Sequence, residues 1–164
     1  MSDHVPRVYI AVSLAVALVL QLFELPYALA VLRPLWVPLV LIYWVMAIPQ
    51  PTGLLTAWIV GLLLDVLLGS VLGQHALGLT LLVFIVLSLR GWLALFPIWQ
   101  EAALLTALWL LYAFLMFWID GATGHRADPW LQWTPVLTTG LCWPVVVAVL
   151  NSLRRRATDD PLHL

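Results

Sequence analysis

The chain has 164 residues, of which 64% are hydrophobic and 9% are charged, and its net charge is -1. A soluble domain is about 45–50% apolar and about 25% charged, and so short a chain cannot bury the excess apolar surface. The near-neutral charge excludes nucleic-acid binding through a basic face, and the high hydrophobicity excludes intrinsic disorder. The lone Cys142 excludes a disulfide scaffold. The composition therefore predicts an all-α integral membrane protein.

The apolar runs, taken in chain order, predict six transmembrane helices joined by short loops. A helix needs about 20 residues to cross the hydrocarbon core, so the chain has room for about six crossings and no separate soluble domain. We expect a single polytopic membrane domain spanning residues 1–164. The predicted helices cover about residues 8–23, 28–48, 54–72, 76–89, 101–119 and 134–153.

The arginines predict that both termini lie in the cytoplasm. Cytoplasmic loops carry an excess of arginine and lysine, and acidic residues contribute little to this bias. Six crossings place five arginines on the side of the termini and two on the other side, and residues 154–164 then form a cytoplasmic tail. A five-helix alternative would separate the first arginine from the last three, which the same rule disfavours. The arginines on the side of the termini are Arg7, Arg90 and Arg154–Arg156, and those on the other side are Arg33 and Arg126.

Asp65 is the most informative charged residue. It lies eleven residues after Leu54, or about 16 Å along the predicted third helix, which would place it near the bilayer midplane. Burying a carboxyl group at that depth costs free energy, so a structural or functional role is expected to offset the cost. One interpretation is a structural carboxyl that hydrogen-bonds neighbouring helices, and the other is a group that handles a proton or a ligand. The structural interpretation has the greater weight, because no basic residue is predicted nearby in the membrane interior.

Three glycines accompany Asp65 at four-residue intervals: Gly61, Gly69 and Gly73. On one helix this spacing forms a stripe of small residues, and such stripes let another backbone approach closely. We therefore expect Asp65 to face protein, or a cavity lined by protein, within a tight seam between helices. The seam serves either internal packing or contact with a partner.

Arg33 and Trp36 begin the second predicted helix on the side opposite the termini. Tryptophan at a helix end is typical of the headgroup region, so one interpretation is an interfacial anchor. The alternative has Arg33 pairing with Glu24, Asp120 or Asp128, or meeting an anionic lipid or a partner protein.

The sequence gives no positive evidence for an enzyme. The four histidines are far apart, fall in predicted loops or tails, and lack metal-ligand spacing. No Ser-His-Asp set and no phosphate-binding glycine loop is present. We therefore predict no catalytic, cofactor-binding or metal-binding residues. The histidines are His4, His75, His125 and His163.

Two stretches of the chain resemble the signature segments of a known family. RPLWVPLVLIYW (Arg33–Trp44) and GLLLDVLLGSVLG (Gly61–Gly73) resemble segments of the rod shape-determining MreD family of Gram-negative bacteria. Further matches are Trp99–Gln100, Phe117–Trp118 and Trp143–Pro144. The resemblance extends over nearly the whole chain.

The resemblance implies a non-enzymatic subunit of the cell-elongation machinery in the bacterial inner membrane, without a cofactor. It implies the single-pass protein MreC as a membrane partner, with the actin-like MreB, the RodA glycosyltransferase and the elongation transpeptidase in the same complex. The family's helical arrangement is also similar to that of the substrate-binding subunits of vitamin transporters. That similarity leaves an alternative open, in which a pocket near Asp65 binds a small molecule or a lipid.

Overall fold

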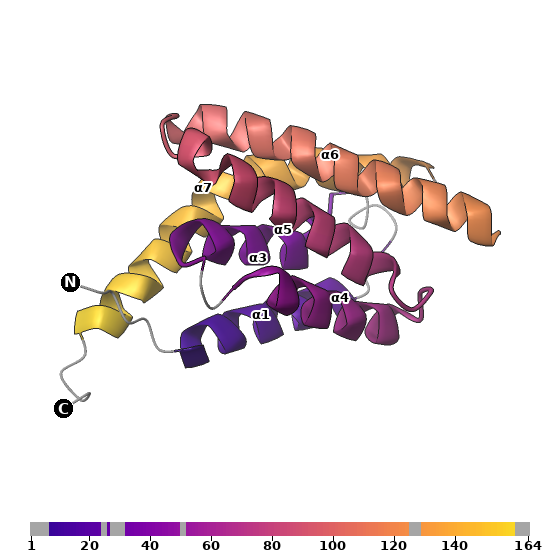
Figure 1. Ribbon diagram of the computed structural model, residues 1–164, viewed down its shortest axis with the longest axis horizontal. Coiled ribbons are helices and arrows are strands. Elements are labelled where there is room, and N and C mark those ends of the chain that lie inside the picture. Colours follow the sequence, from indigo (N-terminus) through magenta and orange to yellow (C-terminus); the bar gives the residue numbers. More distant parts are fainter. Residues whose placement is uncertain (1–6, 24–25, 27–31, 50–51, 125–128, 160–164) are drawn as a thin grey trace.

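A computed structural model describes residues 7–23, 26, 32–49, 52–124 and 129–159. The described residues form six α-helices, shown in Figure 1, and this confirms the all-helical prediction. The helices are α1 (Arg7–Leu22), α3 (Trp36–Ala47), α4 (Leu54–Leu68), α5 (Gln74–Leu93), α6 (Ile98–Thr123) and α7 (Pro129–Asp159).

Three of the helices are long and apolar enough to cross a membrane: α5, α6 and the part of α7 from Trp133 to Arg156. At about 1.5 Å per residue, the 16, 12 and 15 residues of α1, α3 and α4 extend about 24, 18 and 22 Å. These three helices are apolar but shorter than the roughly 30 Å hydrocarbon core. The chain is therefore a multi-pass membrane protein in which half of the described helices are short.

The helix ends differ from the predicted ones where glycine or proline decides the boundary. The third predicted helix extended to residue 72, but α4 ends at Leu68 because Gly69 adopts the left-handed conformation, with φ of 65°. The second was predicted to begin at residue 28, but residues 33–35 are not helical and α3 begins at Trp36, two residues after Pro34. Proline disfavours the helical conformation in the residue before it, so the chain enters α3 from an extended segment.

Helices α5, α6 and α7 are longer than predicted at their polar ends. Helix α5 continues three residues past Arg90 to Leu93, and α6 extends to Thr123, where Gly124 ends it in the left-handed conformation. Helix α7 continues to Asp159 and so includes the arginine triplet. Hydropathy marks only the apolar middle of a helix, so it places the ends too early when the last turns are polar.

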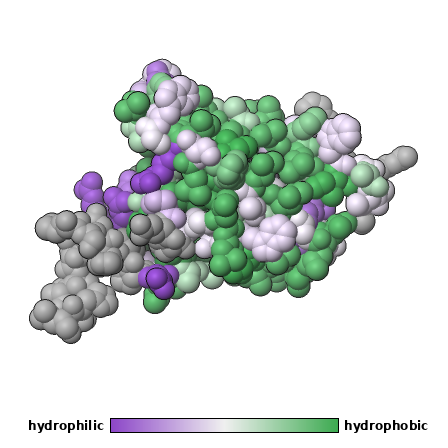
Figure 2. All heavy atoms as spheres, in the orientation of Figure 1, coloured by the Kyte–Doolittle hydropathy of each residue, from purple (hydrophilic) through white to green (hydrophobic). Residues whose placement is uncertain are grey.

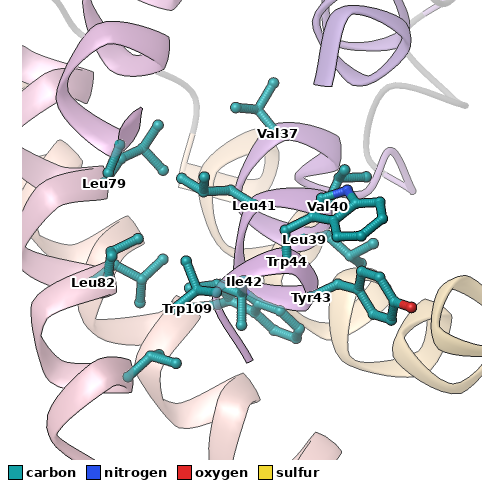
Figure 3. Packing of buried hydrophobic residues seen from close by; sticks show 14 of the residues in the cluster. Val37, Leu39, Val40, Leu41, Ile42, Tyr43, Trp44, Leu79, Leu82 and Trp109 are labelled. Atoms are coloured by element: carbon teal, nitrogen blue, oxygen red, sulfur yellow. The ribbon is translucent and has the colours of Figure 1, made fainter. Parts of the chain in front are cut away.

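Helix α3 forms the centre of the molecule. Every residue from Val37 to Val45 is buried, so this helix has no polar face, as expected of a helix surrounded by others. It packs against α1, α5 and α7, and Figure 3 shows its side chains meeting those of α5 and Trp109 of α6. Two polar atoms of α3 find partners across the core. Trp44 Nε1 donates to Ser13 Oγ at 2.8 Å, and the Tyr43 hydroxyl donates to Asn151 Oδ1 at 2.7 Å.

The outside of the bundle is apolar along most of its length. Figure 2 shows hydrophobic residues over most of the visible surface and hydrophilic residues gathered mainly toward one end. The first residue of α1 and the last residue of α7 lie toward that same end (Figure 1). Large apolar side chains such as Leu55, Val66 and Leu141 are mostly exposed, as expected of a surface that faces lipid.

Candidate functional site

Helices α4 and α5 are joined by a turn that two glycines shape. Gly69 and Gly73 have φ angles of 65° and 97°, and both lie outside the helices. The prediction of one continuous helical stripe of glycines is therefore wrong at these two positions. A Cβ atom at either would meet nothing within 4 Å, so they do not form a packing seam. They are required for their left-handed backbone, which is costly for other residues.

Asp65 lies in the last turn of α4, and its carboxylate is turned toward the start of α5. The residue is 1% exposed. Oδ1 accepts hydrogen bonds from His75 N and Ser70 Oγ, both at 2.8 Å. Oδ2 accepts from Gly73 N at 2.9 Å and from Ala76 N at 3.4 Å. The backbone N–H groups at a helix start have no partner within the helix, so Asp65 acts as the N-terminal cap of α5 from the end of α4. Its expected place in the middle of a longer helix is wrong.

His75 is the basic partner that the sequence analysis did not assign to Asp65. Its Nδ1 lies 2.8 Å from Asp65 Oδ1 and 3.2 Å from Ser70 Oγ. An ionised carboxylate only accepts hydrogen bonds, so the Nδ1 proton is donated to it and Nε2 is left free for another partner. Among the residues that the structure describes, this is the one contact between a basic ring and a carboxylate at hydrogen-bond distance, and it is ionic only when His75 is protonated. A histidine fixed in orientation by a buried carboxylate is a common arrangement at functional sites.

The close approach expected of the glycines occurs at Gly61. A Cβ atom there would overlap the Cα and N atoms of Ala76 and the carbonyl carbon of His75. The backbone of α4 is thus in direct contact with the first turn of α5. Because the obstructing atoms are backbone atoms, they cannot rotate away as a side chain can. Asp65 and Gly61, one turn apart, therefore hold the two helices together by different means.

His75 borders a cavity of about 140 Å³ that lies near the end of α1 and the starts of α3 and α5. The polar groups around it are His75, Tyr112 and Gln21, and the rings of His75 and Tyr112 are 6.4 Å apart. Apolar walls come from residues such as Leu64 and Met116. A cavity of this size has room for a few water molecules or for a ligand about as large as benzene. Asp65 itself is not among the residues that border the cavity; its carboxylate faces the start of α5.

Arg33 and Trp36 lie at the entry to α3, apart from the Asp65 carboxylate. Arg33 Nη1 donates to the carbonyl of Phe23 at 3.2 Å, and its buried Nε has no partner among the described residues. Of the three carboxylates considered as partners of Arg33, only Asp120 is described. Its carboxylate accepts from Gln74 Nε2 at 2.7 Å, and no ion pair between Arg33 and Asp120 occurs among the described residues. The other two predicted partners, residues 24 and 128, lie outside the described residues.

Trp36 is the first residue of α3, and side chains from two other helices satisfy the backbone around it. The Trp36 N–H donates to Gln21 Oε1 at 2.9 Å, and the Leu35 N–H donates to Thr139 Oγ1 at 2.8 Å. The indole packs against the buried core rather than standing free of it. Trp36 thus fastens the start of the central helix to α1 and α7. Its depth in a membrane remains a prediction.

Comparison with known proteins assigns the family. A family model of the rod shape-determining protein MreD matches residues 2–153. The rod shape-determining protein MreD of Haemophilus influenzae is 30% identical over 141 residues, which cover 86% of this chain and 87% of the relative. This chain belongs to the MreD family. The match includes all six described helices except the end of α7, and it confirms the resemblance found in the sequence. No solved structure matches the chain significantly.

In this MreD-family chain, the sequence analysis missed His75, Ser70, Tyr112 and Gln21 as members of the site. Ser70 and His75 lie close to Asp65 in the sequence, five and ten residues after it, in the segment bounded by Gly69 and Gly73 or just beyond it. No comparable signal marked Tyr112 and Gln21, because they meet His75 only through the packing of helices distant in sequence.

Proposed function

We propose that this chain is a non-enzymatic inner-membrane subunit of the bacterial cell-elongation complex. In this proposal it binds MreC and helps organise peptidoglycan synthesis and cell shape, together with MreB, RodA and the elongation transpeptidase. The observation that carries the proposal is membership of the MreD family over residues 2–153. The 30% identical Haemophilus influenzae relative is a rod shape-determining protein MreD, which supports the same role.

The fold supports a role in assembly, because the surface available to a partner protein consists mainly of helix faces. Loops between the described helices are short, as between Leu93 and Ile98, so contact with a membrane partner falls on exposed helix faces. The outer face of α6 carries the exposed aromatic residues Phe114, Phe117 and Trp118, which are suited to a protein or lipid surface. The network around Asp65 supports the structural interpretation of that carboxylate, since its five hydrogen-bond partners among the described residues lie within the α4–α5 hairpin.

The experiment is complementation combined with co-purification. We expect the tagged chain to restore rod shape to cells that lack their own MreD and to retain MreC through detergent purification. Site-specific crosslinkers placed along exposed faces of α1, α4 and α6 would then locate the MreC contact. Restored shape without any crosslink or co-purification would contradict direct binding to MreC. The proposed orientation is tested separately, because a cytoplasm-specific reporter fused after Leu164 should be active.

A second function has one specific observation in its favour, the cavity beside His75. In this alternative the subunit binds a small molecule there, and His75 Nε2, Tyr112 and Gln21 contact it. Ala113 borders the cavity and is 4% exposed, so Ala113→Leu would fill part of it. Ala107→Leu, on the outer face of the same helix, is the matched control.

The two functions predict different results for Ala113→Leu. If the cavity only separates packed helices, filling it should leave both MreC co-purification and cell shape intact. Loss of cell shape with normal expression and normal co-purification would favour the ligand-binding alternative. Ala107→Leu should preserve both properties in either case, because it adds the same bulk outside the cavity.

A further inference from the structure

An apolar groove runs between α1 and α4 on the side of α4 away from the Asp65 network. Its volume is about 560 Å³, four times that of the cavity beside His75. The floor consists of Ile10, Leu14 and Val60, each 6% exposed, and the small side chains of Ala11 and Ala15 leave space along the α1 wall. The groove exists because α1 and α4 contact each other far less than α4 contacts α5.

The groove is polar at one end only. Arg7, the first residue of α1, lines that end together with Thr56 near the start of α4. The two helices run in the same direction in Figure 1, so both of these residues lie at the same end of the groove. The rest of its lining is apolar as far as Leu18 and Leu63. No described residue forms an ion pair with the Arg7 guanidinium.

The length of the groove identifies the kind of occupant. From Arg7 to Leu18 the α1 wall rises eleven residues, or about 16 Å. That is about half of the roughly 30 Å hydrocarbon thickness and thus the depth of a single leaflet. A transmembrane helix of a partner would need a groove through both leaflets. An amphiphile with an anionic head and one leaflet's length of acyl chain matches both the length and the charge.

We propose that the α1–α4 groove is a binding site for a phospholipid. The lipid phosphate binds the Arg7 guanidinium, whose planar donors suit phosphate oxygens. One acyl chain lies along the apolar floor over Ile10, Leu14 and Val60 and fills the space beside Ala11 and Ala15. With the N-terminus in the cytoplasm, the lipid belongs to the cytoplasmic leaflet. This site does not depend on the proposed role in cell elongation.

The test counts phospholipids that remain on the purified full-length chain. The chain is purified without MreC in a mild detergent, washed extensively, and measured by native mass spectrometry, in which a bound phospholipid adds its own mass. We expect about one retained phospholipid per chain. Arg7→Gln removes the charge-assisted contact and should weaken retention on the order of tenfold. Ala15→Phe fills the groove and should abolish retention.

Two matched controls separate a specific site from lipid that merely surrounds the bundle. Arg156→Gln removes an exposed arginine at the end of α7, and Val12→Phe adds the same ring on an exposed face of α1 outside the groove. Both should keep the bound lipid. Circular dichroism and gel filtration verify that every variant is folded. The proposal is overturned if the washed wild-type chain carries no phospholipid, or if Arg7→Gln and Ala15→Phe retain as much as the controls. It is also overturned if the groove accepts lipid-free MreC in place of phospholipid.

Discussion

The two flanks of α4 show opposite ways of placing helices beside each other in a membrane protein. Toward α5, the backbones touch at Gly61 and the Asp65 carboxylate binds the start of the neighbouring helix. Toward α1, a largely apolar groove separates the two helices. Lipid tails are as apolar as leucine, so apolar contact alone gives little reason for helices to close on each other. Hydrogen bonds and a glycine contact join α4 to α5, whereas the α1–α4 boundary holds a groove.

The largest effect is expected from Asp65→Asn, which has nearly the same shape as the native residue. One carboxylate oxygen becomes an NH₂ group that faces hydrogen-bond donors at the start of α5. Each buried donor left without its acceptor costs about 1–3 kcal/mol, and at least two donors face either oxygen. Thermal unfolding in detergent should show the loss, and MreC co-purification should fall with it. Asp120→Asn is the control, since Asp120 is less buried than Asp65 and lies outside the α4–α5 turn, where its carboxylate accepts from Gln74 Nε2.

The large loss of stability expected for Asp65→Asn would not be expected if Asp65 were a lone hydrogen-bonding carboxyl group at the bilayer midplane. In that case asparagine would be a mild substitution. Here five donors hydrogen-bond to the two oxygens, so both oxygens must act as acceptors, and an asparagine side chain has only one acceptor oxygen. Unchanged unfolding of Asp65→Asn would show that the hairpin is held by Gly61 packing alone.

The next largest effect is expected from Gly61→Ala. The added methyl group would overlap backbone atoms of Ala76, so α4 and α5 must separate. Overpacking of this kind costs about 3 kcal/mol. Gly91→Ala is the matched control, because Gly91 is also helical and a Cβ atom there meets nothing within 4 Å. Equal melting temperatures for the two variants would contradict the close approach at Gly61.

A smaller loss is expected from Gly69→Ala, and for a different reason. No atom obstructs a side chain there, but the φ angle of 65° is unfavourable for alanine by about 1–2 kcal/mol. Asparagine tolerates this conformation better, so Gly69→Asn should unfold at a higher temperature than Gly69→Ala. The opposite order would indicate that size and not backbone conformation limits the position.

The sequence was sufficient for the class of fold and the family but not for the geometry of the site. The apolar runs overlap all six described helices, three of which are long and apolar enough to cross a membrane. Asp65 was correctly singled out as unusual, yet its partner His75 was assigned to a loop without a role. The reason is physical. A four-residue spacing of glycines suits both a helical stripe and a glycine-bounded turn, and only the left-handed angles at Gly69 and Gly73 distinguish them. The cavity and the groove depend on contacts between distant helices, which no local pattern encodes.

The smallest change in the free energy of unfolding is expected from Ala15→Leu. Comparing it with Gly61→Ala measures how differently the two sides of α4 tolerate added bulk. Like Gly61→Ala, it adds bulk at a boundary of α4, but the α1 wall has room for the larger side chain. In detergent free of phospholipid, its free energy of unfolding should stay within about 0.5 kcal/mol of the wild-type value, as for surface substitutions. Urea or thermal unfolding of the two variants side by side measures the difference. A loss as large as that of Gly61→Ala would mean that α1 closes on α4 in solution, and the groove would then have no room for an acyl chain.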